Sequence, residues 1–215
     1  MMDAFKLILL GVLQGLTEFL PISSSGHLAI AQKILGINEG LLQITVTLHL
    51  GTLLALFVYF FKDILAALKD IRLIKNILIV TIVTGLIGIT GKDFFESLFS
   101  SIRYVSAALF FTAFILLLSR RYLGGKKSLR DVGVGDSLLL GIAQGIAIIP
   151  GISRSGVTIS ALLFRGFDRV DAFRYSFLAS IPAVIGAFLI ESGGGSLLFS
   201  RNVCLGFLAS FLSGL

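Results

Sequence analysis

The sequence predicts an all-α membrane protein, in which transmembrane helices accompany two re-entrant helical hairpins related by an inverted-topology repeat. The first reason is the composition: 56% of the 215 residues are hydrophobic, 14% are charged, and the mean hydropathy is +1.00. Soluble domains carry roughly 25% charged residues, so this composition excludes a water-soluble globule. The second reason is a set of long apolar stretches, and the third is a pair of similar polar breaks in two of them.

Four apolar stretches have the length and the near absence of charge expected of membrane-spanning helices, which need about 20 residues each. His49 lies within the first of them. We expect this histidine to hydrogen-bond a neighbouring helix rather than to act in a site, because polar side chains in spans often pair between helices. The predicted spans are residues 41–61, 75–91, 104–119 and 172–190, with a partial span at residues 202–215.

Two further apolar stretches, residues 4–31 and 133–164, are each interrupted near the middle by proline, serine and glycine. Backbone groups without hydrogen-bond partners are costly in lipid, so such breaks survive only where protein or a water-filled cavity receives them. We therefore predict that each stretch is a re-entrant hairpin whose tip is buried in the protein.

The two breaks are similar to each other in sequence. Gly11–Ile30 aligns without gaps on Gly141–Ser160 at a constant offset of 130, and seven of the 20 positions are identical. The identical residues are mostly Gly, Gln and Ser, whereas chance similarity between apolar helices would match Leu, Ile and Val. We interpret residues 1–130 as a first inverted repeat and residues 131–215 as a second. Because the second repeat is shorter, we expect its C-terminal part to be truncated.

Basic residues predict the orientation, since short cytoplasmic connections collect Lys and Arg. The first hairpin then enters from outside and the second from inside, which places a site near the midplane. The net charge of +6 is thus a topological signal, and no nucleic acid partner is expected because the composition offers no folded polar surface for one. Three predicted inside connections hold 12 of the 18 basic residues: Lys62, Lys69, Arg72 and Lys75; Arg120, Arg121, Lys126, Lys127 and Arg130; and Arg165, Arg169 and Arg174.

The first break combines an acid, hydroxyl groups and an imidazole. Glu18 is a carboxylate within a membrane segment, which makes it a functional candidate, and Gln14 shares its helix face. The hydroxyls and the free N–H groups at the start of the next helix suit an anion such as phosphate. His27 follows Ser24 by three positions, so one could assist the other in proton transfer or nucleophilic attack. The other candidate binding residues here are Ser23, Ser25 and Gly26.

The second break supplies a cation. Arg154 is a permanent positive charge at membrane depth, and its planar guanidinium suits a phosphate through paired hydrogen bonds. We prefer anion binding to a purely structural pair between Arg154 and Glu18, because such a pair would not need flanking hydroxyls and glycines. The candidate binding residues around Arg154 are Gly151, Ser153, Ser155 and Thr158.

These two motifs resemble those of the undecaprenyl pyrophosphate phosphatase family, the bacitracin-resistance type of membrane lipid phosphatase. The family's [E/Q]-x-x-x-E and P-x-S-S-x-G-H are similar to residues 14–18 and 21–27, and its P-G-x-S-R-S-x-x-T is similar to residues 150–158. The resemblance implies hydrolysis of a C55 polyprenyl diphosphate to the monophosphate and inorganic phosphate, which recycles the lipid carrier of cell-wall synthesis. It also implies a multi-pass protein of the cell membrane whose site opens to the outer face.

Carried over by position, the resemblance implies that Glu18, Ser24, His27 and Arg154 are catalytic. It further implies a divalent cation, Mg²⁺ or Ca²⁺, for which Glu18 and Gln14 are the candidate ligands. A glutamine at position 14 leaves this site with one carboxylate rather than two, and hence with less charge for a cation. The sequence does not distinguish Ser24 from His27 as the nucleophile.

The alternative prediction is a transporter or flippase for a polyprenyl phosphate or another anion, because many secondary transporters also consist of inverted repeats with broken helices. Such a protein would have less need of an acid and an imidazole beside its binding residues. A purely structural scaffold would leave Glu18 and Arg154 unexplained. A homodimer stays open, although we expect the G-x-x-x-G at Gly141 and Gly145 to serve packing within one chain.

Overall fold

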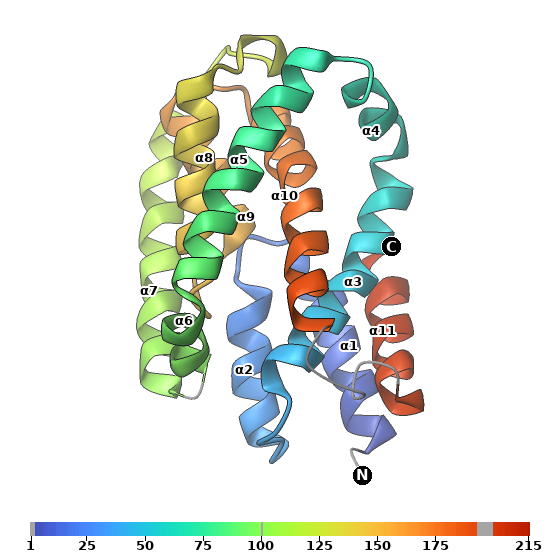
Figure 1. Ribbon diagram of the computed structural model, residues 1–215. Helices are drawn as coiled ribbons and strands as arrows, with labels where there is room; N and C mark the ends of the chain where they lie inside the picture. The colour runs from blue at the N-terminus through green and yellow to red at the C-terminus, as the bar shows by residue number, and fades with distance from the viewer. Residues whose placement is uncertain (1–2, 100, 193–199) are drawn as a thin grey trace.

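Helices make up the regular structure of the chain. The computed structural model describes residues 3–99, 101–192 and 200–215, and within those ranges it contains eleven α-helices and two short 3-10 helices (Figure 1). The prediction of an all-α protein is therefore confirmed. In order the elements are α1 (Ala4–Glu18), α2 (Ser24–Ile34), α3 (Leu41–Tyr59), α4 (Phe61–Ala67), α5 (Ile71–Thr90), α6 (Lys92–Phe99), α7 (Ile102–Ser119), η1 (Arg120–Tyr122), η2 (Leu129–Asp131), α8 (Val134–Ile146), α9 (Arg154–Phe164), α10 (Arg169–Ser192) and α11 (Arg201–Gly214).

Four helical segments are long and apolar enough to cross a membrane, and they coincide with the four predicted spans. In the segments that contain α5 and α7, only 22% of the most apolar window is buried inside the protein. The apolar side chains that remain on their surfaces need a lipid environment rather than water. The chain is thus a multi-pass membrane protein, with candidate spans at Leu41–Tyr59, Ile71–Thr90, Ile102–Tyr122 and Arg169–Ile190.

The second span begins earlier than the sequence suggested, at Ile71 rather than near residue 75. The reason is a helix cap at Asp70, whose side chain accepts hydrogen bonds of 3.0 and 3.2 Å from the backbone N–H groups of Arg72 and Leu73. Such a cap satisfies N–H groups that have no partner in the first turn of a helix. Arg72 consequently lies on α5 itself and not in the connection before it.

The two broken apolar stretches form hairpins of two short helices each, α1 with α2 and α8 with α9. In Figure 1 the first hairpin enters from the lower end and the second from the upper end, and both breaks lie at mid-height. The first hairpin extends to Ile34, three residues beyond the predicted end. Helix α2 stops there because Gly36 adopts a positive φ of 67°, which favours glycine just after a helix.

Close helix packing holds the hairpins in place. Helix α1 lies along α11, and α8 lies along α5. Gly11 and Gly141 make these approaches possible, since a Cβ at Gly11 would lie 2.9 Å from the Ala209 Cβ and one at Gly141 would lie 2.7 Å from the Val83 Cβ. Gly145 similarly packs against Ile87 of α5. The glycines of the G-x-x-x-G motif therefore serve packing within the chain, as expected.

Candidate active site

The tips of the two hairpins contact each other. A Cβ added to Gly26 would lie 2.8 Å from the Gly151 Cα, so the two backbones meet where only glycine fits. The hydroxyl of Ser155 also donates a hydrogen bond of 3.4 Å to the carbonyl of Leu20 in the first tip. The second tip is tied to α7 by Thr112, which donates to the carbonyl of Gly151 and accepts from the Ser153 N–H, at 2.9 and 3.0 Å.

Each hairpin restarts its second helix with a serine cap. The hydroxyl of Ser23 accepts from the Gly26 N–H at 3.2 Å, and the hydroxyl of Ser153 accepts from the Gly156 N–H at 3.1 Å. Helices α2 and α9 therefore both begin at the contact between the tips. Their free N–H groups and the positive ends of their dipoles face one region, which favours an anion there.

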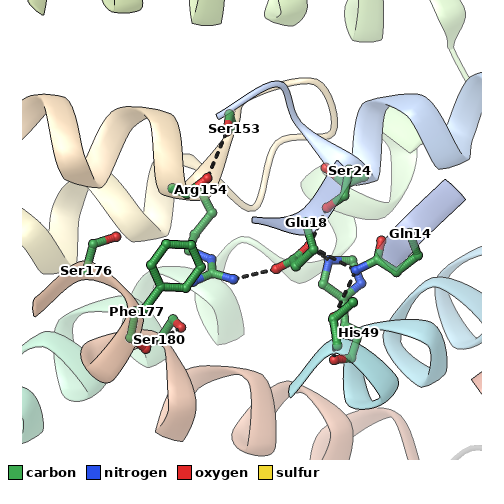
Figure 2. A network of polar contacts seen from close by, with 12 residues as sticks. Gln14, Glu18, Ser24, His49, Ser153, Arg154, Ser176, Phe177 and Ser180 are labelled. Carbon is green, nitrogen blue, oxygen red and sulfur yellow. Dashed lines mark hydrogen bonds and ion pairs between the residues drawn. The ribbon is translucent and has the colours of Figure 1, made fainter. Parts of the chain in front are cut away.

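Glu18, the last residue of α1, lies at the centre of a polar cluster (Figure 2). Its side chain is 7% exposed, and one oxygen, Oε1, lies 2.5 Å from Nη2 of Arg154. The other oxygen, Oε2, accepts from the Ser24 hydroxyl at 2.5 Å and from the Gln14 amide at 2.9 Å. His49 Nε2 lies 3.3 Å from the same Oε2. Four groups thus occupy the roughly four acceptor sites of one carboxylate.

Arg154 is held on two further sides. Its guanidinium lies over the ring of Phe177, 5.4 Å from the ring centroid, and Phe177 is fully buried. A cation on an aromatic face is stabilised by the ring quadrupole. The Thr158 hydroxyl donates to the Arg154 carbonyl at 2.6 Å. Nη1 of Arg154 is buried without a hydrogen-bond partner among the described residues, so this end of the guanidinium is available to an anionic ligand.

His49 belongs to this cluster, which the sequence-based expectation missed. It does contact a neighbouring helix, as predicted, but the residue it contacts on α1 is Glu18. The only signal in the sequence is its position in the middle of a span, which does not identify a partner 31 positions away in the chain. Phe177 and Thr112 were also missed, because an aromatic or a threonine in a span is ordinary packing material.

The cluster faces a cavity of about 310 Å³ between α3, α5, α8 and α10. This volume lies at the lower end of the range for small-molecule sites. Beyond the polar cluster the cavity is lined mostly by apolar or small side chains. This lining continues along the C-terminal parts of α5 and α10 as far as Ile89 and Ile190. Of the predicted site residues, those that line the cavity are Glu18, Ser23, Ser24, Ser25, Ser153, Arg154 and Ser155.

Besides Gln14, the predicted metal ligand, four predicted catalytic or binding residues do not line the cavity. Gly26 and Gly151 form the contact between the tips, and Thr158 is fully buried against α10, 2.6 Å from the Ser176 hydroxyl. His27 is half-buried, with Nδ1 2.8 Å from the Ser23 carbonyl. The geometry gives these residues a role in building the tips. Their predicted contact with a ligand stays a prediction.

The groups around Glu18 do not suit a divalent cation held by the protein. Mg²⁺ and Ca²⁺ take oxygen ligands, whereas the Glu18 oxygens face a guanidinium, an imidazole, a hydroxyl and an amide nitrogen. Gln14 turns its nitrogen toward Glu18, since that nitrogen also donates to the Thr52 hydroxyl. Within the described residues no group of three or more His, Cys, Asp or Glu side chains could hold a metal. The predicted ligand pair of Gln14 and Glu18 therefore does not fit this arrangement.

Comparison with known proteins identifies the family. The family described as bacitracin resistance protein BacA matches residues 7–215. A protein of Halothermothrix orenii named undecaprenyl-diphosphatase is 46% identical, over 99% of this chain and 86% of its own length. Proteins with the same name from Carboxydothermus hydrogenoformans and Thermotoga maritima are 43% and 42% identical, over 99% and 97% of this chain and 85% of their own lengths. The chain therefore belongs to the BacA family of bacitracin resistance proteins.

Proposed function

We propose that this chain hydrolyses undecaprenyl diphosphate to undecaprenyl phosphate and inorganic phosphate, and so recycles the lipid carrier of cell-wall synthesis. The observation that supports this best is a nucleophile, a base and a cation in one cavity. The Ser24 hydroxyl donates to Glu18 at 2.5 Å, and Arg154 lies on the other oxygen of the same carboxylate. The relatives that match nearly the whole chain carry the name of this activity.

In the first step, the Ser24 Oγ attacks the terminal phosphorus of the diphosphate. The Ser24 proton passes to Oε2 of Glu18, which lies within hydrogen-bond distance of it. A bond forms between Oγ and phosphorus while the bond from phosphorus to the bridging oxygen breaks. Undecaprenyl phosphate leaves with the electron pair. Ser24 is preferred to His27 here because it lines the cavity and has a base beside it, whereas His27 is not among the lining residues.

Arg154 and the helix starts hold the phosphates during this step. The unpaired Nη1 of Arg154 offers a donor to the transferring group, and the Ser153 and Ser155 hydroxyls line the same cavity. Phosphoryl transfer depends mainly on positioning and on stabilising charge on the phosphoryl oxygens. A guanidinium and two helix N-termini supply both.

In the second step, water attacks the phosphorus of the phosphorylated Ser24. The Oγ–phosphorus bond breaks, Oγ takes the proton held by Glu18, and Glu18 returns to a carboxylate. The water oxygen stays on phosphorus with both of its protons, so the product leaves as H₂PO₄⁻. Both steps use the same pair of residues, in line with the general logic of an activated nucleophile.

The apolar part of the cavity suits the first isoprene units of the substrate. Its walls carry Gly85 and Gly88 on α5 and Ala183 and Gly186 on α10, which leave room for a chain between the two helices. A cavity of about 310 Å³ is small for a C55 lipid. The rest of the tail must therefore extend into the surrounding bilayer, where it costs nothing to solvate an apolar chain.

An inverted repeat accounts for the arrangement of these elements. Helix α1 packs along α11, and α8 packs along α5. At an offset of about 130 positions α1 corresponds to α8 and α5 corresponds to α11, so the two helix pairs are equivalent in the repeat. Hairpins that enter from opposite ends support the same interpretation (Figure 1).

The outer face is the proposed side of entry. The three connections rich in Lys and Arg, near α4, η1 and the start of α10, lie together at the upper end of Figure 1. By the positive-inside rule this end is cytoplasmic. The cavity runs from the hairpin tips toward Phe99, the last residue of α6, and Ile190, near the end of α10. These two helices end toward the opposite end of the molecule in Figure 1.

The rival function, a transporter for a polyprenyl phosphate or another anion, shares the repeat but makes a different prediction. The purified protein in detergent, with no ion gradient, should release inorganic phosphate from undecaprenyl diphosphate at many turnovers per molecule. Counterflow of the labelled lipid in vesicles without phosphate release would instead support the transporter. The hydrogen bond from Ser24 to Glu18 favours the enzyme, because binding alone does not need a base on a hydroxyl.

A further inference from the structure

His49 lies where it can act on the base of the proposed reaction. It comes from the middle of α3, a helix outside both hairpins, and its side chain lines the same cavity as Ser24 and Arg154. In Figure 2 it lies on the opposite side of Glu18 from Arg154. Its Nε2 is 3.3 Å from Oε2 of Glu18, the oxygen that also accepts the Ser24 hydroxyl.

The hydrogen on the other ring nitrogen is fixed by the helix. Nδ1 of His49 lies 2.7 Å from the carbonyl of Thr45, one turn earlier in α3. A carbonyl oxygen only accepts, so Nδ1 carries a hydrogen and the ring cannot rotate without losing this bond. Nε2 is therefore the ring nitrogen directed at Glu18, 3.3 Å from Oε2.

We propose that His49 is a positioning residue for Glu18, whose Nε2 hydrogen bond holds Oε2 in line with the Ser24 hydroxyl. This inference rests on the proposed phosphatase reaction. Glu18 is the last residue of α1, directly before the break, so its own helix fixes it on one side only. Arg154 draws Oε1 toward α9, and His49 and Gln14 hold Oε2 toward α3 and α1. Without His49 the carboxylate can turn toward Arg154 and away from Ser24.

A structural role alone makes a different prediction. If His49 only filled space on α3, leucine should replace it as well as any other side chain, because the two have similar bulk. Glutamine, in contrast, can place an amide N–H near the position of Nε2 and restore the hydrogen bond to Glu18. Glu18 keeps its ion pair with Arg154 in either variant, so neither leaves a buried charge without a partner.

The test compares wild type, His49→Leu and His49→Gln in detergent, with steady-state phosphate release from a polyprenyl diphosphate as the assay. Thr47→Val on the same helix is the control, since the Thr47 hydroxyl donates only within α3, to the Gln43 carbonyl, and does not line the cavity. We expect His49→Leu to lower kcat about 10- to 100-fold, the effect of one hydrogen bond to a charged group, with KM changed less than about threefold. His49→Gln should recover to within about fivefold of wild type, and the control should match wild type.

Four results would overturn the proposal. If wild type is active and His49→Leu is equally active, His49 does not position Glu18, and the proposed phosphatase activity still holds. A raised KM at unchanged kcat would make His49 a substrate-binding residue instead. Glutamine as damaging as leucine would show that the Nε2 bond is not what matters. If wild type releases no phosphate, the proposed function is wrong, and this inference, which rests on it, is wrong as well.

Discussion

The Arg154 guanidinium lies 2.5 Å from the Glu18 carboxylate, although the two residues are 136 positions apart in the chain. They come from the breaks of different hairpins, so their contact depends on the packing of the two tips. A buried charge is costly to leave unpaired, so the burial of each of these charged side chains depends on the presence of the other. The same contact leaves Nη1 of Arg154 buried and without a hydrogen-bond partner in the described part of the chain.

The first prediction concerns this pair. Arg154→Ala should lower kcat/KM for a polyprenyl diphosphate by about 10²- to 10³-fold, as does removal of an oxyanion-hole donor elsewhere. It should also destabilise the fold by about 3–5 kcal/mol, because Glu18 keeps a buried charge and loses its main partner. Phosphate release and thermal unfolding in detergent measure the two effects. Arg154→Lys should fall in between, since it keeps the charge and loses the planar donors.

Arg174→Ala is the matched control for that prediction. The Arg174 side chain is 44% exposed, pairs with Asp63 and Asp171 near the starts of α4 and α10, and does not line the cavity. Exposed ion pairs contribute about 0–1 kcal/mol, so both activity and unfolding temperature should stay close to wild type. Normal turnover by Arg154→Ala would contradict the assignment of Arg154 to the diphosphate.

The second prediction separates Ser24 from His27. Ser24→Ala should abolish the phosphorylated intermediate and lower kcat at least about 10³-fold, because the nucleophile is gone. His27→Ala should lower kcat only about tenfold, since it removes a hydrogen bond to the Ser23 carbonyl and loosens the tip. Rapid quench of a labelled substrate reaction in SDS near neutral pH, which preserves both phosphoserine and phosphohistidine, followed by peptide mapping, should place the phosphate on Ser24. A phosphohistidine at position 27 would reverse the assignment.

The sequence predicted the hairpins well because local chemistry dictates them. Proline, glycine and serine at the two breaks stop a helix and cap the next one wherever the chain goes, and the structure places Ser23 and Ser153 as those caps. Helix bounds moved by a few residues, at Asp70 and Gly36, where a cap or a positive φ decides the end. Positions that match between the two halves, such as Gly26 and Gly156, build the hairpins.

The chemistry lies instead at positions where the halves differ. At the offset of 130, Glu18 aligns with Ile148 and Ser24 aligns with Arg154. The sequence could therefore single out these residues, but it could not show which groups meet. His49 and Phe177 are on spans that approach the tips only through tertiary packing, and no local pattern distinguishes them from packing residues. Their part in the cluster depends on contacts between distant helices.

The third prediction concerns the single carboxylate. Gln14→Glu would place a second carboxylate about where the Gln14 amide now lies, 2.9 Å from Oε2 of Glu18. Two carboxylates at that distance must share a proton or bind a cation. In EDTA the variant should be at least about tenfold less active than wild type, and Mg²⁺ should restore it, whereas wild type should change less than about threefold. Gln14→Leu, which adds no charge, should show no such rescue.

A metal titration of phosphate release distinguishes these outcomes. Equal dependence on Mg²⁺ in wild type and Gln14→Glu would mean that a cation acts at the site despite its donors, contrary to the arrangement around Glu18. The substrate should be held well above KM, so that any effect of Mg²⁺ on its free concentration does not enter the comparison.

The fourth prediction tests the apolar part of the cavity as the site of the prenyl chain. Gly85 of α5 and Gly186 of α10 both line the cavity, and a Cβ at either position would meet no atom within 4 Å. Leucine at either position should therefore fill the cavity without disturbing the helices. We expect Gly85→Leu and Gly186→Leu to raise KM for a long-chain diphosphate about tenfold, through lost burial of one or two isoprene units.

The effect on a diphosphate with a much shorter tail should be smaller, because less of that tail reaches the filled region. Gly135→Leu is the control: this glycine lies on the exposed surface of α8, also with open space around a Cβ, and does not line the cavity. KM values for the two substrates in all four proteins decide the matter. An equal loss for both tails would point to the phosphate end of the site, and no loss for either would place the prenyl chain elsewhere.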